Sequence, residues 1–180
     1  MKDRLGEDVF KELKKFEISY FQGDDADTLV AYNTDTRFLK INGRFYGLLA
    51  NKELAENTKK QFHSMFTVAI THDLFHYHIR ESGFKYSEEY KEIVKFYEEN
   101  EEVILKVFPF IKKKAIKKNI KGETYKEDVY SEEQRPEEFI VEAIAYLEAG
   151  FLNEKSKNPD HIKIYNFAQK KYNSLKRSKK

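Results

Sequence analysis

Two histidines, His72 and His76, offer the clearest chemistry in this sequence, because they lie four positions apart within an apolar run. In an α-helix, residues i and i+4 lie on one face, so both imidazoles can point at the same place. Histidines at this spacing bind zinc in helices of the H-E-x-x-H type. Here Asp73 stands where that pattern has glutamate. The segment predicts a metal-binding helix face; two core histidines that only form hydrogen bonds are the alternative.

A second helix supplies the remaining ligand that a zinc site with one open position requires. Pro136 favours the first turn of a helix, and the apolar residues from 139 to 147 give this helix a buried face. Glu138 and Glu142 border that face, one turn apart. We predict Zn²⁺ bound by His72, His76 and Glu138. Glu142 is then expected to accept the other ring N–H of a ligand histidine, and Glu137, about 100° away around the helix, is the weaker ligand.

The segments that must position these helices predict an α+β fold. Residues 17–21 and 28–32 are β-prone, and Asn42-Gly43 is typical of the two-residue turn of a β-hairpin. That turn predicts a hairpin of strands 37–41 and 44–50, leading towards the histidine helix. We expect this small sheet to pack on the helix that carries His72 and His76.

The second half of the chain is predicted to be helical. A long helix over 56–79 ends near Gly83, and Ser87 begins the next helix. The lysines at 112–118 are interpreted as a solvated helix face, and 121–133 as a polar loop. The predicted order closes with the helix from Pro136 to Gly150 and a last helix that begins at Asn158-Pro159.

Composition restricts the classes of protein to consider. The 180 residues are 40% hydrophobic and 36% charged, which is typical of one globular domain spanning residues 1–180. The absence of cysteine excludes disulfides, zinc knuckles and thiol catalysis. A net charge of +2 does not indicate a nucleic-acid partner. No apolar stretch is long enough for a membrane span. The compartment stays open: the cytoplasm, or secretion if a signal peptide precedes these residues.

The two helices together resemble the anthrax lethal factor-like family, which includes the catalytic domain of anthrax lethal factor and the secreted Pro-Pro endopeptidases. The similar segments are Thr71–His76 and Arg135–Tyr146. The family has H-E-x-G-H, a loop with a tyrosine, and then N-x-x-E-[FY]-F-A-E-[AS]-F-A-x-Y. The resemblance implies a zincin-like domain, with a small mixed sheet and hairpin packed on the histidine helix and followed by a helical half.

The same resemblance assigns roles to single residues. It implies that His72, His76 and Glu138 are the zinc ligands and that Glu142 supports them from behind. It also implies that a tyrosine in the loop before Pro136 stabilises the oxyanion. Tyr130 is the candidate for that role, and Tyr125 is its rival.

The chain departs from the family pattern at two positions of the histidine helix. Asp73 replaces the glutamate that acts as general base, and Phe75 replaces a small residue. The shorter carboxylate falls back from the attacking water by about one C–C bond, whereas a base must come within about 2.6–3.2 Å. The ring of Phe75 is expected to crowd the substrate cleft. The segment between His76 and Glu138 is also longer than in the peptidases.

Two functions follow from these observations. The first is a zinc metallopeptidase of the lethal factor type, acting on a peptide or protein with Asp73 as base and Tyr130 at the oxyanion. Strand 44–50 would then hold the substrate by β-augmentation. The second is a non-catalytic binding module that docks on a protein partner. The amino-terminal domain of lethal and edema factors has this fold without a zinc site and docks on the protective antigen. Segments 55–60 and 139–146 resemble it.

Overall fold

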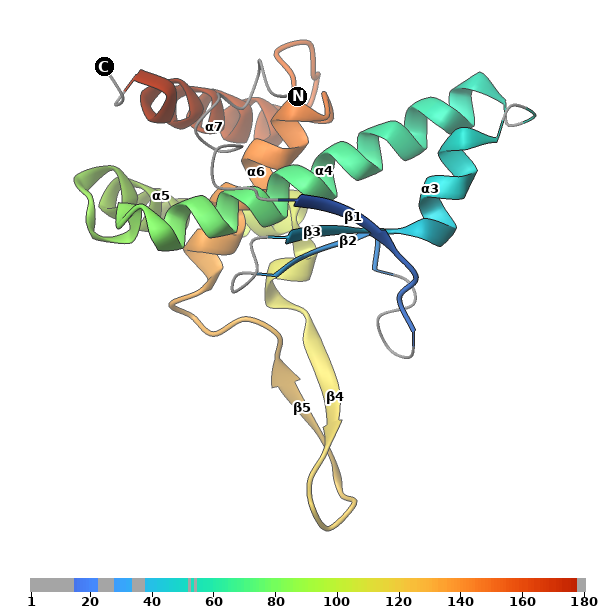
Figure 1. Ribbon diagram of the computed structural model, residues 1–180. Helices are drawn as coiled ribbons and strands as arrows, with labels where there is room; N and C mark the ends of the chain where they lie inside the picture. Colours follow the sequence, from blue (N-terminus) through green and yellow to red (C-terminus); the bar gives the residue numbers. More distant parts are fainter. Residues whose placement is uncertain (1–14, 23–27, 34–37, 52, 54, 178–180) are drawn as a thin grey trace.

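Helices and small sheets together make this an α+β protein. The computed structural model describes residues 15–22, 28–33, 38–51, 53 and 55–177 (Figure 1). Its strands are β1 Lys15–Ser19, β2 Val30–Asn33, β3 Phe38–Asn42, β4 Lys114–Lys118 and β5 Thr124–Asp128. Its α-helices are α3 Gly43–Ala50, α4 Glu56–Glu81, α5 Glu88–Val107, α6 Arg135–Glu148 and α7 Pro159–Arg177, and η2 Phe84–Tyr86 and η3 Pro109–Lys112 are short 3₁₀ helices.

The first sheet has three strands and β3 is its centre. β1 runs parallel to β3 and pairs Lys15 with Phe38, whereas β2 runs antiparallel and pairs Val30 with Ile41. Leu39 of β3 is completely buried and belongs to the same apolar core as the helices. Figure 1 shows α4 running across this sheet. The prediction of an α+β fold with a small mixed sheet is therefore confirmed.

The predicted hairpin around Asn42-Gly43 is wrong, because the chain enters helix α3 at Gly43. Asn42 caps this helix: its side-chain oxygen accepts a hydrogen bond of 3.1 Å from the backbone N–H of Arg44. The Asn42 amide also donates to the carbonyl of Thr28 at 2.9 Å, and its backbone N–H donates to Leu29 at 3.0 Å. Asn is as good a helix cap as a turn former, and its buried partners decide between the two.

Gly43 packs closely against the end of β1 and does not adopt the positive φ of a type I′ turn. A Cβ atom at Gly43 would lie 3.1 Å from the Tyr20 ring and 3.3 Å from Ile18. Helix α3 can therefore begin directly against β1. Residues 44–50, predicted as a substrate-holding strand, are helical and cannot add a substrate strand to the sheet.

The long helix predicted over 56–79 is confirmed as α4, Glu56–Glu81. Gly83 follows it with φ 68°, the left-handed conformation that ends helices. The Ser87 side chain then caps α5 by accepting from the backbone N–H of Tyr90 at 3.1 Å. Among the described helices, none combines the length and the apolar character needed to cross a membrane.

The helical half is built around Phe139 of α6, which is completely buried. Phe96 of α5 and Phe167 of α7 stack on each other at 3.7 Å, and both stack on Phe139. Phe108 contacts Phe139 from the carboxyl end of α5. Since α5 and α7 cover α6 on this side and α4 covers it on the other, α6 has no solvent-exposed face between residues 135 and 145.

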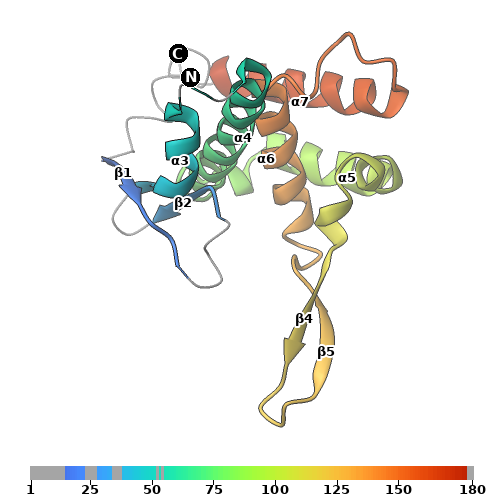
Figure 2. The same ribbon diagram turned by 90° about the vertical axis from the view of Figure 1, so that its right-hand side faces the viewer.

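A second sheet consists only of β4 and β5, an antiparallel pair that projects from the helical body in both views (Figures 1 and 2). The sequence interpretation was wrong here. The lysines at 112–118 lie at the end of η3 and on β4, and β5 lies within the segment predicted to be a loop. Local apolar periodicity is weak in this hairpin because every residue of β5 is exposed.

The cap at Asn42 gives a first prediction. Replacing Asn42 with Ala removes the helix cap and leaves the Thr28 carbonyl without its side-chain donor. We expect a loss of about 1–3 kcal/mol in the free energy of unfolding, measured by urea denaturation. Asn153→Ala is the matched control, because Asn153 also accepts from residue i+2 and donates to a carbonyl but is exposed. Equal losses in the two variants would contradict the importance assigned to the buried cap.

Candidate metal centre

Helices α4 and α6 pack against each other and bring three potential metal ligands together. His72 and His76 project from one face of α4, and Glu138 projects from the first turn of α6. One nitrogen of each histidine and one Glu138 oxygen all lie within 4.8 Å of one another. These are the three residues that the sequence nominated, and they form a cluster that could hold a metal ion.

The ligand atoms face one another with the geometry that a metal needs. Nε2 of His72 lies 3.4 Å from Oε1 of Glu138, and Nε2 of His76 lies 2.9 Å from Oε2. Ligands at about 2.0–2.2 Å from a tetrahedral ion are separated by about 3.3–3.6 Å. The two imidazole rings lie edge to face, with centroids 4.6 Å apart, so both Nε2 atoms can point at one ion.

The opposite ring nitrogens are each held by a second carboxylate. Nδ1 of His72 lies 2.7 Å from Oε2 of Glu142, and Nδ1 of His76 lies 2.8 Å from Oε1 of Glu137. A carboxylate at Nδ1 fixes the tautomer in which Nε2 carries the free lone pair and makes that nitrogen a better ligand. Glu142 therefore lies where the sequence placed it, behind His72.

Glu137 is the functional residue that sequence reasoning missed. Its direction, about 100° from Glu138 around the helix, was taken only as an argument against direct coordination. In the structure this rotation carries Glu137 past the ligand and onto the far nitrogen of His76. The spacing of three acids at 137, 138 and 142 could have predicted this arrangement, because two histidines need two such supports and one shared ligand.

The surroundings of one buried atom indicate whether these residues fit a metal ion. Oε1 of Glu138 is buried and makes no hydrogen bond within the described part of the chain. A buried carboxylate oxygen without a partner is energetically costly. A cation placed between Oε1 and the two Nε2 atoms would satisfy it. The donor set of two imidazoles and a carboxylate suits a divalent transition metal, so the residues fit the group.

In the absence of a metal, the histidines and carboxylates of the cluster compensate one another's charge, and this shifts their pKa values. Burial lowers the pKa of His76, but hydrogen bonds and charges from Glu137 and Glu138 outweigh it and raise the pKa to about 9. Burial raises the pKa of Glu137, but His76, together with Arg80 and Lys85, lowers it to about 2. The pKa of Glu138 is also lowered, mainly by His76 against the effect of burial. The imidazolium of His76 thus supplies the positive charge that the carboxylates require.

A cavity of about 500 Å³ opens on the cluster and contains Tyr130. Besides the ligands, its lining includes Arg80, Lys85 and Gln134. Burial, and after it the Glu138 carboxylate, raises the pKa of Tyr130, so its hydroxyl remains a proton donor at neutral pH. The rival Tyr125 lies on β5 in the projecting hairpin and is half exposed. The structure thus brings Tyr130 to the site and leaves Tyr125 away from it.

The two departures from the family pattern lie outside this cavity. Phe75 is buried in the core with its ring 6.2 Å from that of Tyr172 on α7, so the expectation that it crowds the cleft is wrong. Asp73 is partly buried on α4 and is not part of the described lining of the cavity.

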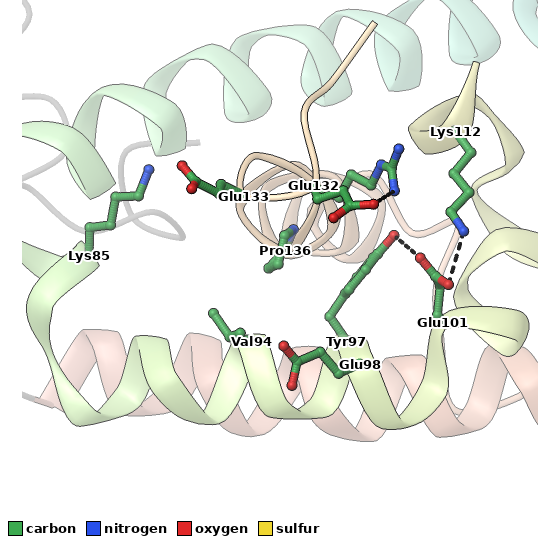
Figure 3. Close-up of a pocket in the computed structure, with 10 residues that line it drawn as sticks. Lys85, Val94, Tyr97, Glu98, Glu101, Lys112, Glu132, Glu133 and Pro136 are labelled. Atoms are coloured by element: carbon green, nitrogen blue, oxygen red, sulfur yellow. Dashed lines mark hydrogen bonds and ion pairs between the residues drawn. The ribbon is translucent and has the colours of Figure 1, made fainter. Parts of the chain in front are cut away.

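A second cavity, of about 680 Å³, lies beside the first and shares Lys85 with it. Figure 3 shows Tyr97, Glu101 and Lys112 joined along one wall: the Tyr97 hydroxyl donates to Glu101 at 3.1 Å, and Lys112 pairs with Glu101 at 3.0 Å. Arg135 lines this cavity and binds Asp128 of β5 at 2.9 Å. This ion pair fixes the base of the projecting hairpin to the start of α6, and hence to the metal ligands.

Comparison of the chain with protein-family models, curated proteins and solved structures gives no match. Fold and site define an α+β protein with a His-His-Glu cluster, carried by two packed helices, that could hold a metal ion.

The roles assigned to the acids predict an order of metal affinities. Glu138→Gln removes a ligand and should nearly abolish zinc binding, measured by calorimetry on chelator-stripped protein. Glu142→Gln and Glu137→Gln each remove the support of one histidine and should weaken binding about 10–100-fold. Glu148→Gln, at the end of the same helix, is the control and should leave binding unchanged. If Glu142→Gln weakens zinc as much as Glu138→Gln does, the assignment of the ligand is wrong.

The pKa of His76 predicts how metal binding depends on pH. Zinc must displace the proton from His76, whose pKa is about 9, so affinity should rise about tenfold per pH unit below that value and level off above it. In the metal-free protein a raised histidine pKa has the opposite effect: its stabilisation is complete below about pH 6.5 and disappears as pH rises through 9. Melting curves with zinc and with EDTA should therefore separate as pH increases. If the melting temperatures with zinc and with EDTA differ equally at pH 6 and at pH 8.5, the displacement of a proton by zinc is contradicted.

Proposed function

We propose that this protein is a zinc-dependent metallopeptidase of the anthrax lethal factor type. The observation that supports it best is the arrangement of five side chains from α4 and α6. His72, His76 and Glu138 converge on one point, and Glu142 and Glu137 hold the far nitrogens of the two histidines. The buried Oε1 of Glu138, which makes no hydrogen bond within the described chain, supports a cation at this point.

Zinc is the metal we propose, because two neutral imidazoles and one carboxylate are a common catalytic zinc set that leaves one position open. When bound there, zinc supplies Lewis-acid activation of a peptide carbonyl and of the attacking water. The protein's contribution is to hold the two Nε2 lone pairs and the Glu138 oxygen in fixed positions. Glu142 and Glu137 do this by accepting the Nδ1 protons of His72 and His76.

Tyr130 is the proposed oxyanion partner. It lines the same cavity as the ligands, and its raised pKa keeps the hydroxyl protonated, so it can donate to the negative oxygen that develops on the carbonyl. Asp73 is the proposed general base, by its position after the first histidine. Its short side chain and its place outside the cavity lining predict a slow peptidase.

The substrate we propose is a peptide or an extended protein segment. The cavity of about 500 Å³ at the ligands and the second cavity of about 680 Å³ are both lined by Lys85. Together the two cavities offer room for residues on more than one side of the scissile bond. Arg80 and Lys85 line the first cavity and can bind substrate carbonyl groups, although both also pair with Glu137.

The position of Asp73 also favours a second candidate, a non-catalytic binding module with the same fold. If Asp73 cannot reach the attacking water, the metal and its cluster serve to stabilise α4 against α6. The cavity beside Tyr130 would then dock a protein partner without cleaving it. Activity measurements on Asp73 variants separate the two functions.

Peptidase activity gives the next prediction. We expect slow, zinc-dependent cleavage of a peptide library that EDTA abolishes. Asp73→Glu should raise the rate, because it restores the reach of the base, whose full effect is about 10²–10⁴. Tyr130→Phe should lower the rate about 10–1000-fold with zinc content unchanged. Tyr125→Phe is the control and should have no effect.

The contrary outcomes distinguish the candidates. Zinc binding without cleavage by either the wild type or Asp73→Glu would favour the binding module. A lower rate in Asp73→Glu would show that the pocket is adapted to aspartate and would contradict our account of the base. No zinc binding in any variant would reduce the cluster to hydrogen-bonded core histidines.

A further inference from the structure

The projecting hairpin of β4 and β5 is an unusual structure for a protein of this size. Each strand has five residues, so the hairpin extends about 17 Å from its base. Figures 1 and 2 show it standing away from the helices in two perpendicular views. An isolated two-stranded hairpin is only marginally stable in water. The ion pair between Arg135 and Asp128 anchors the hairpin to the body of the protein and so helps to maintain it. Beyond this anchor, the outer part of the hairpin contacts nothing else in the described chain.

The tip of the hairpin, residues 119–123, is a closed turn organised by Asn119. The Asn119 side-chain oxygen accepts from the backbone N–H groups of both Lys121 and Glu123 at 2.9 Å. The backbone of Asn119 pairs with Glu123 and with Gly122, and Gly122 has the positive φ, 80°, that this turn requires. Four of the five backbone N–H groups of the tip thus have partners within it, whereas the carbonyls of residues 120–122 have none among the hydrogen bonds of the described chain. Water and lipid head groups can satisfy these carbonyls at a membrane surface, but the hydrocarbon core cannot.

This turn presents an isoleucine at the farthest point of the protein. Ile120 has a relative exposure of 107%, so none of its surface is covered. Ile116 on β4 is 70% exposed, and Tyr125 on β5 is half exposed. Water-exposed isoleucine is unfavourable, and tyrosine is enriched at membrane–water interfaces. The apolar side chains of the hairpin are therefore placed for contact with a medium outside the molecule.

The charge of the hairpin differs from that of the rest of the chain. Residues 114–128 contain five lysines and three acids, a net +2, whereas the 28 basic and 28 acidic residues of the rest of the chain cancel. Near the base, Lys114 pairs with Asp128 and Lys117 pairs with Glu127. Lys121 at the tip and Lys126 on β5 form no ion pair within the described chain, and both are exposed. The tip also contains one acid, Glu123, which is exposed and accepts a hydrogen bond from the Asn119 amide. The positive charge near Ile120 that has no ion-pair partner among the described residues is therefore that of Lys121 and Lys126.

We propose that the hairpin is a membrane-docking element, which inserts Ile120 into the surface of a bilayer containing anionic lipids. Ile120 would enter the boundary between head groups and acyl chains, and Lys121 and Lys126 would bind the lipid phosphates and carboxylates. The narrow tip, the internally bonded turn and the flanking cations all fit this partner. A nucleic acid would bind the lysines, but it would leave Ile120, the apolar side chain at the tip, without a role. The proposal does not depend on the metal centre.

Binding of the full chain to lipid vesicles tests the proposal. With about 0.1 M NaCl, the protein should sediment with vesicles of phosphatidylcholine and about one third phosphatidylserine, and not with phosphatidylcholine alone. Lys121→Gln and Lys126→Gln should each lower the partition coefficient about fivefold. Ile120→Asp should lower it about tenfold or more. The matched controls are Lys163→Gln and Met65→Asp, which change an exposed lysine and an exposed apolar residue on α7 and α4.

Insertion can be observed directly, because the chain contains no tryptophan. In Ile120→Trp, the single tryptophan should shift its fluorescence to the blue on addition of anionic vesicles. In Met65→Trp it should not. The same emission in buffer and with vesicles for Ile120→Trp would overturn insertion. Binding that is equal for both kinds of vesicle, or unchanged in Ile120→Asp, would overturn the proposal. Displacement of the protein from vesicles by single-stranded RNA through the same lysines would assign the hairpin to nucleic acid instead.

Discussion

Burial of three carboxylates on one helix is the constraint on which the rest of this structure depends. Glu137, Glu138 and Glu142 lie on a stretch of α6 that has no exposed face. Such groups are tolerated only where positive charge and hydrogen bonds compensate them. His72 and His76 on α4 contribute to this compensation: Nδ1 of each faces Glu142 or Glu137, and both Nε2 atoms face Glu138. The contact between α4 and α6 is therefore specified by charge as well as by packing, and its register cannot slip by a turn without leaving buried acids unpaired.

The same constraint explains why a metal ion fits the cluster so directly. Without a metal, a proton on His76 together with Arg80 and Lys85 compensates the carboxylates in part, and Oε1 of Glu138 makes no hydrogen bond within the described chain. A divalent ion would replace that proton and satisfy the remaining oxygen at the same time. Stability and function are thus connected at this point: the groups that hold α4 and α6 together are those that the proposed chemistry uses.

Around this centre, the protein consists of a packed helical core and a hairpin that projects from it. The aromatic core around Phe139 fixes α5, α6 and α7, and α6 in turn fixes the ligands. The long segment between the two ligand helices contributes Tyr130 to the cavity and then extends outward as the β4–β5 hairpin. Arg135, the first residue of α6, binds Asp128 of β5 and so connects the hairpin to the helix that carries Glu138. This one segment thereby provides both a residue of the cavity and the exposed hairpin for which we propose membrane docking.

The sequence by itself determined the features that depend on local periodicity. The spacing of His72 and His76 fixes one helix face, and the spacing of Glu138 and Glu142 fixes another. The boundaries of α4, α5 and α6 follow from Gly83, Ser87 and Pro136, because caps and breakers act within one turn. Only the tertiary structure decided whether Asn42-Gly43 turned a hairpin or began a helix, since the carbonyls of residues 28 and 29 bind the buried Asn42 and so select the cap. It likewise placed Glu137 on His76, Tyr130 in the cavity and Asp73 outside it. Those outcomes depend on how two helices far apart in the chain are rotated against each other, which no local pattern records.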